Sequence, residues 1–238
     1  MGRAYEVRKA SIQKTGAARG KIYTMYAKEI YQAAKNGGTE PSSNATLKRL
    51  LDRAKKEQVP SDIIKRAIDK VNSGVDENYQ QTVYEMFGPA GATLVIECLT
   101  DNLNRTVSEL RAVVNKCHIK MGAMGSVLFN YDHLCVVGFK GLTEEETMEA
   151  LIENGADFID MENDDNSIIV YGNPQDLYQI KEAISTKLPD VEFDIDEITY
   201  MAKEKINISG DDLVIFERVL SMLDDVEDVQ NVYHNVNL

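Results

Sequence analysis

Apolar residues recur at intervals of three and four in three stretches of the first 75 residues, the spacing typical of amphipathic helices. Gly37 and Gly38 end the first stretch, and Ser42, Ser43 or Asn44 can cap the second. The three stripes are Ile22, Tyr26, Ile30, Ala33 and Ala34, then Leu47, Leu50, Leu51 and Ala54, then Ile63, Ala67, Ile68 and Val71. Three short helices of this kind can share one small core.

Residues 79–131 mix strand-like and helical patterns. Two apolar segments flank a Gly-Pro-Ala-Gly turn at 88–91, which is typical of paired strands. A helix that Asn104 can cap follows, and SVLFNY at 126–131 has the composition of a third strand. The pattern therefore predicts the order ββαβ, which lacks a final helix and strand.

Residues 132–205 have a complete βαββαβ pattern, which predicts a ferredoxin-like domain. Thr143 and Glu146 have the spacing of a capping box for a helix that ends at Gly155. Pro174 begins a second helix that ends near Lys187. The expected strands are 133–140, 156–161, 167–172 and 191–199, with a turn at 162–166.

The last segment has a helix and a strand that cannot form a stable domain alone. Ser209 can cap the helix, and 229–236 has a strand pattern. The helix stripe is Leu213, Phe216, Leu220 and Leu223. We therefore predict an α+β multidomain protein in which one α+β domain interrupts another. The expected domains are a basic arm and three-helix domain at 1–78, a middle domain at 79–131 plus 206–238, and the ferredoxin-like domain at 132–205.

The charge of the chain is divided along its length. The formal net charge is −13, yet residues 1–75 carry 16 Lys and Arg against 7 Asp and Glu, whereas 76–238 carry 10 against 32. The segment 8–21 contains five cations and no carboxylate, namely Arg8, Lys9, Lys14, Arg19 and Lys21. This division predicts a basic module for a polyanion joined to acidic modules. The alternative is a basic head that pairs with its own acidic body.

Composition and motifs exclude several classes of protein. The apolar runs are too short for a membrane span, no apolar segment of a signal peptide occurs at the start, and three cysteines favour a reducing cytoplasm. Cys117, His118, His133 and Cys135 could hold zinc, but no CxxC or HxxxH spacing supports a metal site. No phosphate-binding loop or nucleophile elbow occurs. We therefore expect no enzyme activity, cofactor or small-molecule substrate.

Several segments resemble one known family. They are GRA and RK at the start, RGKIYT, KEI, AAKNGG, NATLKRLLDRAKKEQVPSDIIKRAIDK, YEMFGPAG, LTDNLNRT, MGAMGSV and DVQNVYHN. In this order they make the chain similar to the YebC/PmpR family, nearer its shorter-headed branch. The resemblance implies three domains and a cytoplasmic protein without catalytic residues. Its members are described as DNA-binding transcriptional regulators or as translation factors that ease stretches such as consecutive prolines, and a mitochondrial relative is a translational activator.

The candidate contacts for a polyanion lie in the arm and in the second helix. Phosphate binding by the arm competes with the alternative of a solvated tail. Arg49, Arg53 and Lys56 share a helix face, which could also be an ordinary salt-linked surface. Tyr5 stands where the family usually has Trp and keeps a stacking face. Secondary candidates are Asn102, Asn104 and Arg105, although Asn104 could simply cap a helix and Asn102 could form the turn.

These observations lead to the hypothesis of a non-enzymatic, nucleic-acid-binding regulator of gene expression that resembles probable transcriptional regulators. The runner-up hypothesis is a ribosome-associated translation factor that binds RNA, and a third is a protein-interaction scaffold. The expected partner is DNA or ribosomal RNA, and the sequence leaves the choice open. The absence of a helix-turn-helix signature weakens sequence-specific DNA recognition.

Overall fold

The computed structural model describes residues 19–164 and 166–238. They form two compact units, Tyr131–Met201 and residues 19–130 together with Ala202–Leu238. Separate hydrophobic cores belong to the helical head, to the middle sheet and to the unit Tyr131–Met201. The predicted fold class, an α+β protein with a helical head and an interrupted middle domain, is confirmed.

The head consists of three helices whose apolar stripes meet in one core. Asn44 caps the second helix by accepting a hydrogen bond from the Leu47 N–H, and it donates its amide to the Ala33 and Gly38 carbonyls. A Cβ atom at Gly37 would lie 2.6 Å from the Asn44 side chain, so glycine is required at that position. The helices are α2 (Arg19–Gly37), α3 (Ala45–Lys56) and α4 (Ser61–Asn72).

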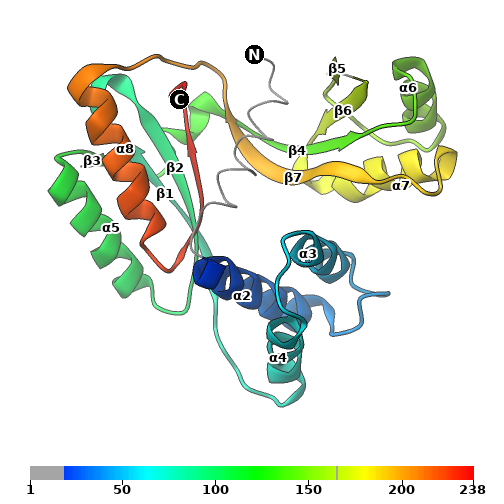
Figure 1. Ribbon diagram of the computed structural model, residues 1–238, viewed down its shortest axis with the longest axis horizontal. Helices are drawn as coiled ribbons and strands as arrows, with labels where there is room; N and C mark the ends of the chain where they lie inside the picture. The colour runs from blue at the N-terminus through cyan, green and yellow to red at the C-terminus, as the bar shows by residue number, and fades with distance from the viewer. Residues whose placement is uncertain (1–18, 165) are drawn as a thin grey trace. The chain divides into compact units, whose positions relative to one another are not determined.

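The middle sheet draws its strands from both sides of the interruption. Its order is β3-β1-β2-β8, and β8 pairs antiparallel with β2. Helices α5 and α8 lie side by side on one face of this sheet (Figure 1) and bury its apolar side chains. The strands are β1 (Gln80–Phe87), β2 (Thr93–Thr100), β3 (Lys120–Met121) and β8 (Val229–His234), and the helices are α5 (Leu103–Cys117) and α8 (Gly210–Asp224).

Two expectations for this domain are wrong. The third strand is the short β3, and part of the predicted strand 126–131 is a 3-10 helix, Leu128–Asn130. The cap of α5 is Asn102, which accepts a hydrogen bond from the Arg105 N–H, whereas Asn104 lies inside the helix. In both segments a side chain binds the backbone: the Thr100 hydroxyl accepts a hydrogen bond from the Asn102 N–H, and the Glu85 carboxylate accepts one from the Leu128 N–H.

The carboxylate of Glu85 holds the loop that replaces the predicted strand. Glu85 is 3% exposed and accepts hydrogen bonds from the Gly125, Val127 and Leu128 N–H groups. Gly125 has φ of +79°, a conformation that favours glycine. Because these backbone donors point at one carboxylate, they are not available for a strand ladder.

Replacement of Glu85 by glutamine should loosen this loop. The substitution places an NH2 donor against N–H groups that need an acceptor, and such a loss costs about 1–3 kcal/mol at a buried site. Amide exchange at Gly125, Val127 and Leu128 should accelerate, whereas Glu217→Gln, an exposed change on α8, should leave it unaltered. Unchanged exchange in the Glu85 variant would show that the carboxylate does not hold the loop.

The unit Tyr131–Met201 has the predicted order βαββαβ, and its sheet has the order β5-β6-β4-β7. The capping box of Thr143 and Glu146 is confirmed. Strand β5 lies later in the chain than predicted, and the hairpin turn is correspondingly shorter than 162–166. The strands are β4 (Tyr131–Phe139), β5 (Asp160–Asp164), β6 (Ser167–Gly172) and β7 (Phe193–Ala202), and the helices are α6 (Glu144–Glu153) and α7 (Leu177–Lys187).

Candidate nucleic-acid interface

Helix α3 carries a dense basic surface. Its twelve residues include five cations and one carboxylate, Asp52, which pairs with Lys55 at 3.6 Å. Lys48, Lys55 and Lys56 are exposed, whereas Arg49 and Arg53 are half-buried against the head. An exposed ion pair of this kind contributes little to stability, and the helix as a whole has five cations against one carboxylate.

The predicted contacts Arg49, Arg53 and Lys56 all lie on this helix. Burial raises the pKa of the Tyr26 phenol well above its usual range. The positive charge of Arg53 favours the ionised phenol and only partly opposes this rise. Tyr26 and Tyr31 are buried in the head core, so they are not open stacking platforms. The sequence prediction did not include Lys48 and Lys55, which are the other cations of the same helix.

The predicted contacts in the arm divide into two groups. Tyr5, Arg8, Lys9 and Lys14 lie outside the described residues. Arg19 begins α2 and is exposed. The ammonium of Lys21 lies 3.0 Å from the Asp224 carboxylate at the end of α8 and also donates to the Asp224 carbonyl, and its side chain is only 15% exposed.

A buried carboxylate, Asp228, joins the head to the middle domain. It is completely buried and lies 3.0 Å from the ammonium of Lys28 on α2, which is itself 7% exposed. The hydroxyls of Thr100 and Thr106 donate to it at 3.0 and 2.9 Å, and the guanidinium of Arg105 donates through Nε and Nη2 at 2.8–3.1 Å. The segments TDNLNRT and DVQNVYHN, which are far apart in the sequence, therefore meet at one charged group.

This network has electrostatic consequences. Burial alone would raise the pKa of Asp228, but the hydrogen bonds from Arg105, Lys28 and Thr106 outweigh it and hold that pKa below its ordinary value. Conversely, hydrogen bonds to Asp228 and Asp101 raise the pKa of Arg105 further above its usual range. The basic head thus pairs in part with the acidic body. Asn102 and Arg105 perform structural tasks, because one caps α5 and the other neutralises Asp228.

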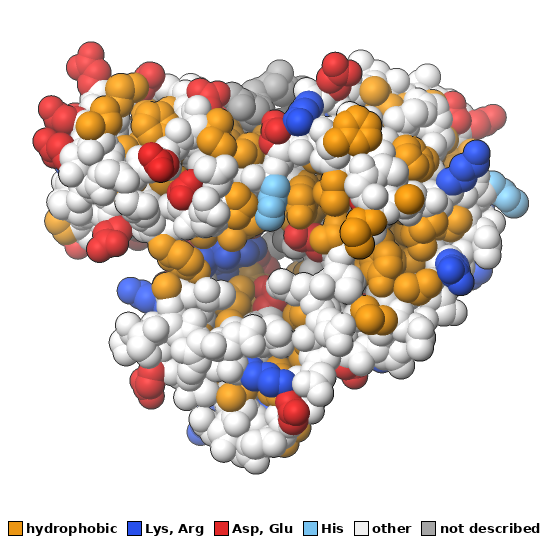
Figure 2. Space-filling view, turned by 180° about the vertical axis from the view of Figure 1, so that it is seen from behind, with side chains coloured by type: hydrophobic (Ala, Val, Ile, Leu, Met, Phe, Trp, Pro, Cys, Tyr) orange, Lys and Arg blue, Asp and Glu red, His pale blue; other side chains and the backbone are white. Residues whose placement is uncertain are grey.

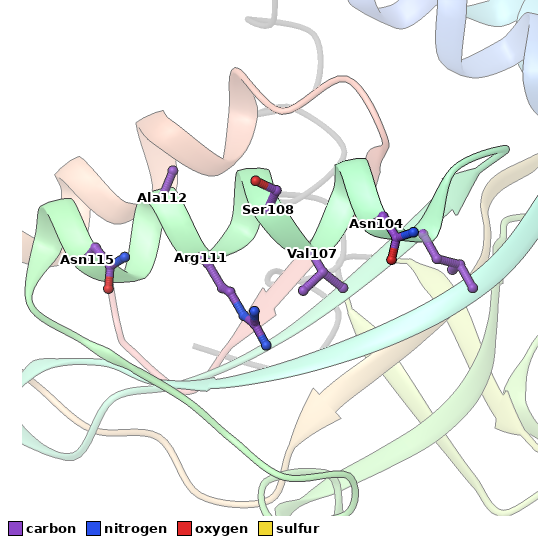
Figure 3. Close-up of a pocket in the computed structure, with 7 residues that line it drawn as sticks. Asn104, Val107, Ser108, Arg111, Ala112 and Asn115 are labelled. Carbon is purple, nitrogen blue, oxygen red and sulfur yellow. The ribbon is translucent and has the colours of Figure 1, made fainter.

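Asn104 belongs to a different surface, a shallow hollow of about 490 Å³ along the outer face of α5. Figure 3 shows Val107 and Arg111 projecting from one side of this helix. Ser108, Arg111 and Asn115 line the hollow with Asn104 and add hydrogen-bond donors to it. The hollow is a further place on the acidic body where an anion could be contacted.

The cysteines lie in apolar surroundings. Burial raises the pKa of Cys98 to about 12, and the sulfur of Cys117 lies 3.6 Å from the Met222 sulfur. Cys117 and Cys135 belong to different hydrophobic cores. Within residues 19–164 and 166–238, no group of three His, Cys, Asp or Glu side chains has a geometry for a metal ion. None of the described helices is long and apolar enough to cross a membrane.

The fold and these surfaces define a class of protein, an α+β protein with a basic helical head attached to an acidic body. Sequence comparison assigns the chain to a family within that class. Residues 3–74 match the model of the TACO1/YebC protein N-terminal domain, and residues 79–236 match the TACO1/YebC second and third domain. The chain belongs to the TACO1/YebC family.

Curated relatives cover the whole chain. A protein of Alteromonas mediterranea is 44% identical over 99% of this chain and 98% of its own length, and one of Vibrio cholerae is 44% identical over the full length of both. Both are named "probable transcriptional regulatory protein". Among solved structures, a conserved hypothetical protein of Aquifex aeolicus is similar with a TM-score of 0.71 and 31% identity, covering 94% of this chain and 92% of that one.

Proposed function

We propose that this protein is a non-enzymatic regulator of gene expression that acts in the cytoplasm and binds nucleic acid through its N-terminal part. The observation that carries the proposal is the basic surface of α3, with five cations in twelve residues. Such clusters bind phosphate backbones without reading bases. The names of the relatives support a regulatory role at the level of transcription.

A second candidate is a translation factor that binds structured RNA on the ribosome. The observation that favours it is the acidic body, since residues 76–238 carry 32 carboxylates against 10 cations. Along a bare duplex, phosphates beside the head would also repel this body. A folded RNA–protein surface can accept the head in a cleft and leave the body facing protein or solvent.

Sedimentation of a lysate through a density gradient separates the two candidates. A transcriptional regulator should be recovered with chromatin and should not move when RNase is added. A ribosome-bound factor should migrate with ribosomal particles and leave those fractions after RNase treatment. Migration as a free protein in both conditions, at low salt, would contradict nucleic-acid association altogether.

A further inference from the structure

A second basic site lies in the acidic body, far along the chain from α3. A hollow of about 740 Å³ opens where the end of β1, the end of α5, strand β3 and the start of α8 meet. This volume is within the range of small-molecule sites. Apolar side chains contribute to its wall, including Phe87 at 39% exposure and Ile215 at 36%.

Three of the five cations of the middle domain line this hollow. Residues 79–131 and 206–238 contain only five Lys and Arg against eleven Asp and Glu. Lys116, Lys120 and Arg218 all line the hollow, together with the exposed imidazole of His118. In the described part of the chain, no carboxylate forms an ion pair with these three cations. Three cations around one hollow that has a single carboxylate, Asp212, in an otherwise acidic domain indicate an anionic ligand.

The backbone around the hollow is held in place before any ligand arrives. Phe87 and Lys120 are direct partners in the ladder between β1 and β3, so their side chains start about 5 Å apart. His118 ends α5 in a left-handed conformation with φ of +55°, and its N–H bonds back to the Asn115 carbonyl. Contact between Cys117 and Met222 fixes α5 against α8. Preorganisation of this kind reduces the entropic cost of binding.

We propose that this hollow binds a nucleoside phosphate, either as a free nucleotide or as one nucleotide unit of an RNA strand. Lys116, Lys120 and Arg218 supply charge-assisted donors for the phosphate. The ring of Phe87 offers a face for stacking a base. The single carboxylate of the hollow, Asp212, accepts hydrogen bonds from a sugar hydroxyl or a base amino group. Figure 2 shows such a combination, with Lys and Arg side chains bordering a hydrophobic area toward the right edge of the view.

The test is an NMR titration of the full chain with AMP and, separately, with a 5′-phosphorylated hexanucleotide. Saturable shifts are expected at the amides of residues 116–120 and 215–218. A Lys116→Gln, Arg218→Gln double variant should weaken binding by at least about tenfold, because two phosphate-binding cations are removed. The matched control is the Lys140→Gln, Lys187→Gln double variant, which removes two exposed cations of the unit Tyr131–Met201 that line neither hollow, and it should bind AMP as the wild type does.

The outcomes identify the source of the ligand. Binding of AMP at the hollow supports a free nucleotide. Shifts at the hollow with the hexanucleotide alone, abolished in the double variant, support a nucleotide unit of RNA. Shifts with neither probe, or equal affinity in wild type and double variant, overturn the site. That failure would leave the proposed function intact if variants of α3 still lose oligonucleotide binding.

Discussion

Replacement of Asp228 by alanine is expected to lower the free energy of unfolding of the unit that contains the head and the middle domain by about 3–5 kcal/mol, which is the cost of breaking a buried ion pair. The ammonium of Lys28 would remain buried without its closest partner, and Thr100, Thr106 and Arg105 would lose an acceptor. In a protein of this size, 1 kcal/mol corresponds to roughly 2–4 °C. Scanning calorimetry should therefore show a melting temperature at least about 6 °C lower.

A matched control and a double variant make this result specific. Asp225→Ala removes an exposed carboxylate three residues away and should change stability by no more than about 0.5 kcal/mol. Adding Lys28→Met to Asp228→Ala should recover part of the stability, because it removes a buried ammonium whose remaining partner is the exposed carboxylate of Glu227 at 3.4 Å. Equal melting of the Asp228 and Asp225 variants would show that the buried network does not hold the two domains together.

The same carboxylate predicts a dependence on pH. The pKa of Asp228 is lower in the folded protein than in the unfolded chain, where it is about 3.9. Its stabilising contribution is therefore complete above that unfolded value and is lost as the pH falls toward the folded pKa. The difference in melting temperature between wild type and Asp228→Ala should be constant near neutral pH and shrink below about pH 4.

Neutralising two exposed cations of α3 is expected to weaken nucleic-acid binding by at least about tenfold at roughly 0.1 M salt, because each phosphate contact contributes strongly at low salt. The variant carries Lys48→Gln and Lys56→Gln, both on the solvated side of the helix. The control carries Lys140→Gln and Lys187→Gln in the unit Tyr131–Met201. Fluorescence anisotropy with a labelled oligonucleotide compares them. An equal decrease of affinity in both variants would mean that net charge, and not the surface of α3, governs binding.

Elements whose determinants are close in sequence were predictable. The stripe of α2 and the capping box of Thr143 and Glu146 depend on residues within one or two helical turns. For the cap of α3 the sequence offered Ser42, Ser43 or Asn44, and the structure has Asn44. Strand β8 was also predictable, because a lone helix and strand at the end of the chain need a sheet to join. In these elements the spacing of apolar residues and the capping side chains predict the same helix or strand that the structure has.

The errors occur where a tertiary contact fixes the backbone. Asn102 caps α5 while its own N–H donates to the hydroxyl of Thr100, two residues earlier, and that hydroxyl is in turn held by the distant carboxylate of Asp228. The segment 126–131 has a strand composition, yet Glu85, about forty residues earlier, binds its amides. In both cases a tertiary hydrogen bond overrides local propensity.

The candidate site was predictable in its charge but not in its internal pairing. The cations of α3 are visible in the sequence, whereas the pairing of Lys28 with Asp228 spans 200 residues. No signal in the sequence indicated this pairing, because Lys28 lies two residues from both Tyr26 and Ile30 and therefore on the opposite side of α2 from the stripe in the head core. A buried cation needs a carboxylate partner, but that partner lies in the middle domain. The basic hollow of the middle domain also had no signal, since its cations come from separate elements.

The central claim is that the basic head binds phosphate, and the salt dependence of affinity tests it most directly. Anisotropy titrations of the full chain with one labelled RNA and one labelled duplex DNA, each at three salt concentrations, give the slope of log affinity against log salt. We expect a steep negative slope that becomes shallower by about 1.4–1.8 in the Lys48→Gln, Lys56→Gln variant, or roughly 0.7–0.9 for each phosphate that is no longer neutralised. A slope near zero, or one identical in wild type and variant, would contradict phosphate binding by the head.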